Sequence, residues 1–290
     1  TQSVFRDFVS NGRGNTDWLG FDDGQRALSP MYPRNNGLFN QLPLEEQVLV
    51  SKSFNDGVYA EQTRKAAPIQ SYALTYANAS KFKNGGSLGT VVGITYRNSQ
   101  MLVPEVSRKI QNFDNLPIFD YNDAQNRYAT TIGALANVAY AKGKTKVSFK
   151  NLFNQFFEDN YYRRTGRNED QLQDIQMRSS VLNQRSLYSG QLELTHQFKN
   201  KWRFTANGNY AFNKKEQPDL RVQTYQRTVG STTGYSLNTR GNNTNRFWSD
   251  LADNAFGYQT RLEIPFQLKG LKQQVSLGGG SLLRIRQFEA

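Results

Sequence analysis

The sequence predicts an all-β fold: a segment of an antiparallel transmembrane β-barrel, about nine strands of a larger barrel, with short periplasmic turns and long extracellular loops. Hydrophobic residues make up only 37% of the chain, although aromatic residues reach 13%. Apolar and polar residues alternate with period two, and tight turns alternate with long polar stretches. Because successive side chains of a strand point to opposite faces, this pattern suits a sheet with one apolar face and one wet face.

Four pairs of alternating runs predict four β-hairpins between residues 69 and 290. In the second pair, Val147, Phe149 and Phe153 share one face, opposite Lys146 and Lys150. Each pair is joined by a short turn, and the Asn-Gly of the first turn is the strongest short hairpin signal. The four predicted turns are 83–86, 142–144, 199–201 and 269–271.

The links between these hairpins are long and rich in Asn, Asp, Gln and Arg. They cover residues 99–126, 158–175 and 214–250. Loops longer than about 15 residues are uncommon in compact soluble domains, whereas outer-membrane barrels alternate short periplasmic turns with long extracellular loops. We therefore expect residues 1–9 to end a first strand, 10–68 to form a long outer loop, and 69–290 to form four hairpins with long outer loops.

Charged residues occur within the alternating runs, opposite the apolar side chains. In a barrel of this kind they would line the lumen, while the apolar face, with aromatic residues near both strand ends, would contact lipid. We expect Arg261 and Glu263 to form an ion pair inside the lumen. The residues expected to line the lumen are Lys146, Lys150, Arg203, Arg261, Glu263 and Arg284.

The composition argues against catalysis and against a cofactor or metal site. The chain has no Cys and one His, His196, so it has neither a thiol nucleophile nor a His cluster. Asp17, Asp22 and Asp23 lack the spacing of a calcium-binding EF-hand loop, and we expect them to accept local N–H groups. The net charge of +12 comes from scattered Lys and Arg, so no nucleic-acid partner is expected. We expect the protein not to be an enzyme.

Several segments carry a resemblance to a known family. They are TQSVFRDFVSNGRG at 1–14, TDWLGFDDGQRALS at 16–29, SFNDG at 53–57, KAAPIQSYALTYAN at 65–78 and RSLYSGQLELTHQF at 185–198. They resemble the start of the barrel in TonB-dependent receptors of the Bacteroidetes type, the SusC-like group. The block at 16–29 is the most specific of these segments.

The resemblance implies a protein of the bacterial cell outer membrane that transports a nutrient, such as a glycan, a peptide or a metal chelate. In that family a plug domain precedes a barrel of about 22 strands, so we expect this chain to be the N-terminal part of the barrel without the plug. The implied partners are outer-membrane lipid, the receptor's own plug domain and TonB. In the SusC-like group a SusD-type surface lipoprotein is a further partner.

The expected outer loops carry aromatic residues amid Asn and Arg, a combination that suits stacking on polar solutes. The ligand-binding residues expected there are Trp18, Phe21, Tyr225, Tyr235 and Trp248. The same aromatic residues would also serve to pin the loops to one another. Two other readings of the chain remain open, a passive porin-like channel and a soluble β-sandwich adhesin or binding module.

Overall fold

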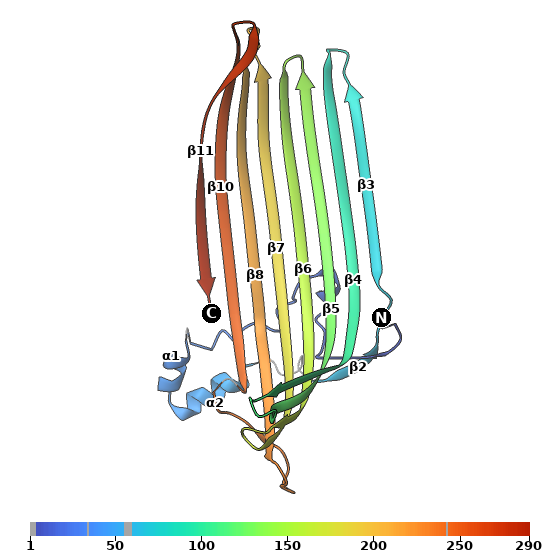
Figure 1. The fold of residues 1–290 in the computed structure, drawn as a ribbon, viewed down its shortest axis with the longest axis vertical. Helices are drawn as coiled ribbons and strands as arrows, with labels where there is room; N and C mark the ends of the chain where they lie inside the picture. The colour runs from blue at the N-terminus through green and yellow to red at the C-terminus, as the bar shows by residue number, and fades with distance from the viewer. Residues whose placement is uncertain (1–3, 34, 55–59, 242) are drawn as a thin grey trace.

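The computed structural model describes residues 4–33, 35–54, 60–241 and 243–290, and one antiparallel sheet dominates it. Eight long strands follow one another across this sheet in sequence order, and the short β9 pairs with β8 (Figure 1). The strands are β3 (Gln70–Lys81), β4 (Gly86–Gln111), β5 (Pro117–Lys142), β6 (Thr145–Asn168), β7 (Gln173–Gln197), β8 (Arg203–Thr228), β9 (Ser236–Leu237), β10 (Asn245–Leu268) and β11 (Leu271–Glu289).

The predicted all-β class and the four hairpins are confirmed. Short connections join β3 to β4, β5 to β6, β7 to β8 and β10 to β11, all at one end of the sheet (Figure 1). We call this the turn end, and the opposite end the tip end. The sheet is open, because β3 and β11 form its two edges and do not pair with each other.

The prediction of long irregular links is wrong for most of their length. β4 continues to Gln111 and β5 begins at Pro117, so most of 99–126 is paired strand. The same holds for 158–175, where β6 ends at Asn168 and β7 begins at Gln173. Backbone hydrogen bonds between strands do not depend on which side chains the strands carry. The strands therefore continue into stretches where apolar and polar residues no longer alternate in the sequence.

Among the bulges near the tip end of the sheet, two contain a proline. Two residues of β4, Pro104 and Glu105, stand opposite one residue of β5. In β8, Pro218 and Asp219 add one residue relative to both neighbouring strands, and Asp219 has a positive φ of 51°. Proline has no N–H to donate to the ladder, so a bulge is one of the few positions that accept it within a sheet.

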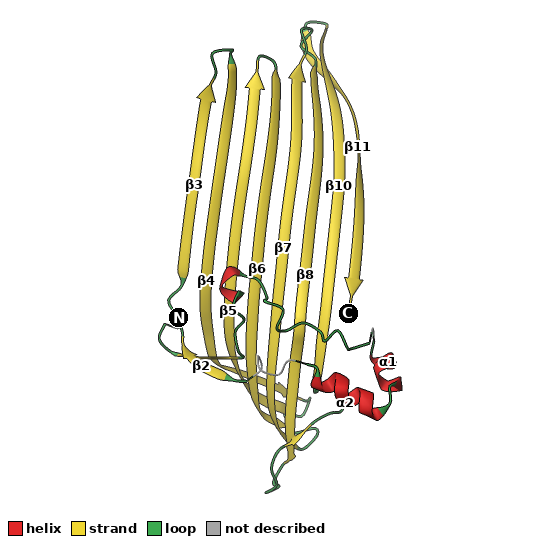
Figure 2. Ribbon diagram, turned by 180° about the vertical axis from the view of Figure 1, so that it is seen from behind, coloured by secondary structure: helices red, strands yellow, loops and turns green. Residues whose placement is uncertain are grey.

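The N-terminal segment forms a separate unit that lies against the tip-end half of the sheet. It contains β1 (Asp7–Ser10), the 3-10 helix η1 (Asp17–Leu19), α1 (Asn36–Gln41), α2 (Leu44–Lys52) and β2 (Gln62–Lys65). Figure 2 shows η1 in front of β5 and β6.

The expectation that residues 1–9 end a strand of the main sheet is corrected. β1 pairs with β2 in a separate sheet of two strands. Backbone hydrogen bonds between these strands therefore hold the two ends of the expected outer loop together. Residues 1–3 of the predicted first strand and residues 55–57 of the SFNDG segment lie outside the described residues.

The strand register confirms the predicted division into an apolar and a charged face. Tyr140 stands opposite Leu88 on one side and Val147 on the other, and Phe149 stands between Val138 and Leu192. Residues opposite each other share a face of the sheet. The charged residues Lys146, Arg203, Arg261 and Glu263 occupy alternate positions and therefore the other face.

The buried core lies where the N-terminal segment packs on the sheet. Phe157 and Phe8 are 0% and 1% exposed, and Ala66, Tyr128 and Leu182 complete the cluster. Tyr128 and Phe157 belong to the same face of the sheet as Tyr140 and Phe149. One face is therefore apolar and open near the turn end, and covered near the tip end. Among the described residues, no helix combines the length and apolar character needed to cross a bilayer.

Candidate functional site

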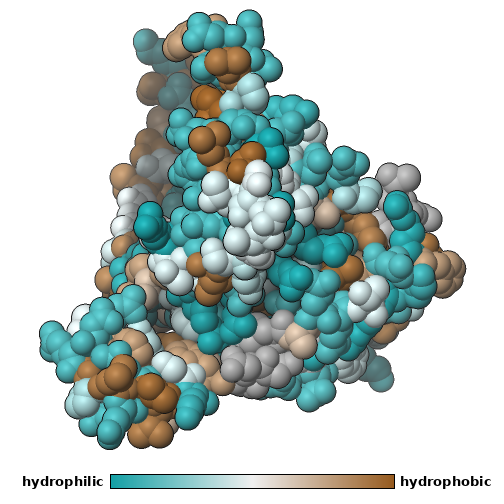
Figure 3. All heavy atoms as spheres, turned by 90° about the horizontal axis from the view of Figure 1, so that it is seen from below, coloured by the Kyte–Doolittle hydropathy of each residue, from teal (hydrophilic) through white to brown (hydrophobic). Residues whose placement is uncertain are grey.

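A cavity of about 1010 Å³ lies near the tip end, between the N-terminal segment and the sheet. We call it the tip cavity. Figure 3, which views the molecule from the tip end, shows a mainly hydrophilic surface with separate apolar patches. The N-terminal segment contributes Asp22, Gly24, Ala27, Leu28, Tyr32 and Pro33, and the sheet contributes Gln184, Glu216, Gln217, Pro218, Trp248, Ser249, Asp250, Phe288, Glu289 and Ala290.

Three polar residues form one row across the sheet at the cavity. Gln184, Glu216 and Asp250 stand opposite one another on β7, β8 and β10. Gln184 Nε2 donates to Glu216 Oε2 at 2.7 Å, and Gln184 Oε1 accepts from the Asp22 backbone N–H at 2.7 Å. The Lys214 ammonium lies 2.5 Å from Glu216 and 3.3 Å from Asp250. These contacts join the loop to three strands and fix the polar wall.

Trp248 forms an aromatic wall of the cavity and is held in place by several contacts. Its Nε1 donates to the backbone oxygen of Arg26 at 2.9 Å, and its ring centroid lies 5.6 Å from that of Phe54. The Arg246 guanidinium lies 4.6 Å from the Phe54 ring and 4.9 Å from the Trp248 ring, and it also binds Asp219. Trp248 is therefore held in one orientation by contacts from both the loop and its own sheet.

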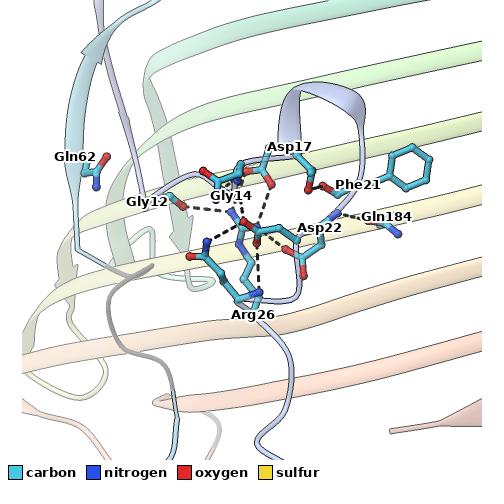
Figure 4. Close-up of polar contacts among 12 residues, drawn as sticks. Gly12, Gly14, Asp17, Phe21, Asp22, Arg26, Gln62 and Gln184 are labelled. Atoms are coloured by element: carbon cyan, nitrogen blue, oxygen red, sulfur yellow. Dashed lines mark hydrogen bonds and ion pairs between the residues drawn. The ribbon is translucent and has the colours of Figure 1, made fainter.

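Arg26 organises the loop that borders the cavity (Figure 4). Its guanidinium lies 3.0 Å from Asp17 and 2.6 Å from Asp22, and it donates to the Gly12 carbonyl at 3.2 Å. The Arg26 and Asp17 side chains are only 6% and 2% exposed. Burial raises the pKa of Asp17 even though the hydrogen bond from Arg26 opposes this shift. The two side chains are thus buried together, and each depends on the other as its partner.

A second set of contacts fixes the loop to the sheet. Gln155 Nε2 donates to the Gly20 carbonyl at 2.6 Å, and the Tyr96 hydroxyl donates to the Trp18 carbonyl at 3.0 Å. Gly20 has a φ of 80°, and a Cβ there would lie 3.3 Å from Gln155 Cγ. Only glycine satisfies both the backbone conformation and this close approach.

The five aromatic residues predicted to bind ligand do not form one site. Trp248 lines the tip cavity, whereas Trp18 and Phe21 lie at η1, and Trp18 is 57% exposed. Tyr225 is paired with Leu237 of β9, and the Tyr235 ring lies 4.6 Å from the Arg227 guanidinium. The polar row of the tip cavity was missed, because its members are neighbours only once the register is known.

Most of the residues predicted to line a lumen gather on the charged face near the turn end. Lys146, Arg203, Arg261 and Glu263 line one cavity of about 570 Å³. The expected Arg261–Glu263 ion pair is not present. Glu263 lies 3.7 Å from Arg203, which stands directly opposite it, because residues two apart on a strand are farther apart than opposed ones.

Lys150 and Arg284, the other two residues of the predicted lumen set, lie elsewhere on the sheet. Lys150 lies 3.4 Å from Glu193 and lines a neighbouring hollow. Arg284 binds Asp253 across the pairing of β10 and β11.

The acidic residues of the loop accept local hydrogen bonds, as predicted. Asp17 accepts from the Gly14 backbone N–H at 2.9 Å, and Asp23 accepts from that of Asn15 at 2.8 Å. The pairing of Asp17 and Asp22 with Arg26 was not predicted. In the part of the chain that the structure describes, no three His, Asp or Glu residues are grouped so as to hold a metal ion.

No protein-family model matches this chain, and no curated protein is similar to it in sequence. The family resemblance of the sequence segments therefore remains a proposal.

Replacing Arg26 by alanine is expected to release the loop from the sheet. The change leaves the Asp17 carboxylate buried without its partner, a loss of about 3–5 kcal/mol for a buried ion pair. Hydrogen exchange of the backbone amides of 12–27 measures this release. Lys65→Ala is the control, since the Lys65–Asp7 pair is exposed and should matter little. Equal protection in both variants would show that Arg26 does not hold the loop.

Proposed function

We propose that this chain is part of an outer-membrane barrel that transports a nutrient, with its apolar band in lipid and its charged face toward the lumen. The height of the apolar band carries the proposal. Alternate apolar or small residues run from Ile132 to Tyr140 in β5 and from Phe256 to Phe266 in β10. Spans of about 9–11 residues are those with which a tilted strand crosses a bilayer.

Aromatic residues at both margins of the band support this placement. At the turn end the Phe82 and Tyr140 rings lie 6.4 Å apart, and Trp202 is partly exposed. At the other margin Tyr210 stacks on Phe256 at 4.8 Å, and further pairs, Tyr72 with Tyr96 and Tyr188 with Tyr210, continue the row. Aromatic girdles at two heights are typical of barrels in the outer membrane.

The proposal requires that both edges of the sheet pair with further strands. β3 and β11 each have one unpaired edge, and an open edge within hydrocarbon leaves backbone groups without partners. A wider barrel removes both edges. The wide barrel of the TonB-dependent receptors, which the sequence segments resemble, satisfies this requirement.

In this scheme the tip end faces the medium, and the tip cavity lies on the outer face of the wall, beyond the apolar band, where it binds a solute at the cell surface. By resemblance, a plug domain would block the lumen until TonB acts on it, and a SusD-type lipoprotein would meet the tips. A passive porin-like channel is the second candidate, since the charged face alone would also suit a polar pore. A β-sandwich is disfavoured, because the described residues place no second sheet over the apolar band.

The apolar band predicts different costs for arginine at adjacent positions. Tyr258 and Gln259 are both exposed, but they lie on the apolar and the charged face respectively. Tyr258→Arg should destabilise the membrane-inserted receptor by about 1–2 kcal/mol, because it places a charge in the bilayer between the interface and the midplane, where the cost is largest. Gln259→Arg should cost far less. Equal costs in a refolding titration in lipid vesicles would contradict the lipid-facing band.

The topology and the transport are tested together in cells that express the whole receptor. A protease added outside should cut near 231–235 in the connection between β8 and β10, while the turn at 199–201 stays protected. Uptake of the transported solute should then stop when the proton-motive force is dissipated. Cleavage at 199–201 in intact cells would reverse the topology, and uptake that survives dissipation would favour the passive channel.

A further inference from the structure

A buried charged cluster lies between the N-terminal segment and the sheet. At its centre is Asp159 of β6, which is 5% exposed and lies six residues beyond Phe153, outside the apolar band. The segment presents Arg13, Arg26 and Asp17 to it. On the sheet, Tyr128 and Leu182 stand opposite Asp159, and the Ser180 hydroxyl donates to it. Asp22, which interacts with Asp17, and Arg64 of β2, which interacts with Arg13, complete the charged groups.

The cluster is incompletely paired. Asp159 Oδ1 is buried without a hydrogen-bond partner among the described residues, and so are Nε and Nη2 of Arg13. The Arg13 guanidinium lies instead over the Tyr128 ring at 4.2 Å and the Phe8 ring at 5.5 Å. The ion pairs of Arg26 go to Asp17 and Asp22. An ionised carboxylate in this position is costly, because Asp159 is buried and the described side chains do not supply a full set of donors.

We propose that docking of residues 11–27 on the sheet takes up a proton at Asp159. Acid then completes the wall of the tip cavity, and neutral or alkaline medium releases the segment that forms it. Residues 11–27 supply Asp22, Gly24 and Ala27 to the cavity, so their release removes one wall of the site. The consequence for solute capture rests on the proposed function. The proton linkage itself depends only on the buried cluster.

The direction of the effect follows from the protonation of the docked state. Burial raises the pKa of Asp159 to about 6, above its ordinary value of 3.8, and burial also raises the pKa of Asp17. The docked state therefore binds a proton more tightly than the released state. The stabilisation is fully present below pH 3.8 and is lost as the pH rises through 6. Between pH 5 and pH 7 the docking equilibrium should weaken about tenfold.

Hydrogen exchange of the whole receptor in detergent, between pH 5 and pH 8, tests the proposal. After correction for intrinsic exchange rates, protection of the amides of 12–27 should fall about tenfold from pH 5 to pH 7. Asp159→Asn should keep high protection at all pH values. The matched control is Asp253→Asn, since Asp253 is held by Arg284 and Arg286 away from the segment and its loss should preserve the wild-type profile.

A second variant covers the case in which Asp159→Asn does not fold. Ser180→Ala removes a donor to the ionised carboxylate and should shift the midpoint of the profile to higher pH. A flat wild-type profile, or an unchanged slope in Asp159→Asn or an unchanged midpoint in Ser180→Ala, would overturn the linkage. This measurement needs no transport, so its failure is distinguishable from a failure of uptake, and the reverse also holds.

Discussion

Uninterrupted pairing between β5 and β6 is the constraint on which the rest of the molecule depends. The two strands pair from the turn at Lys142 and Thr145 to Phe119 and Asn168 without a shift in register. Each side chain therefore keeps its face over the whole length of the strand. The open apolar band and the surface that receives the N-terminal segment must then lie on the same face. Near the tip end, the segment covers aromatic and polar residues of this face that would otherwise be exposed to water.

The covered surface differs from the band in its chemistry because it binds backbone. Gln155 and Tyr96 continue the rows of the apolar band, yet both donate to carbonyl groups of the loop. A loop that lies flat on a sheet brings polar backbone groups with it, and these must be satisfied. Aromatic and amide side chains meet this need while still filling space. The five residues of the apolar core then exclude water from the contact.

The features that depend on alternation and turns were predictable from the sequence. The Asn-Gly turn and the alternating runs around Val147 and Phe149 gave the hairpins and the two faces correctly. Alternation does not mark the tip ends of the strands, where residues such as Asp123 and Arg164 pair and polar residues occur on both faces. The pairing of β1 with β2 brings together residues about fifty positions apart, and no local pattern marks that contact. The row of Gln184, Glu216 and Asp250 also needs the register of three strands.

The bulge at Pro218 and Asp219 separates the two halves of β8. Before it, the apolar face holds even-numbered residues such as Tyr210 and Phe212, and after it the same face holds odd-numbered residues such as Arg221. The extra residue therefore acts as a frame shift within a single strand. A gain or loss of one residue at the bulge would therefore move the side chains of the tip part of β8 to the opposite faces of the sheet. The part of β8 between the bulge and the turn end would keep its side chains on the same faces. The tip of β8 is thereby free to diverge in length and chemistry from the strand that carries it.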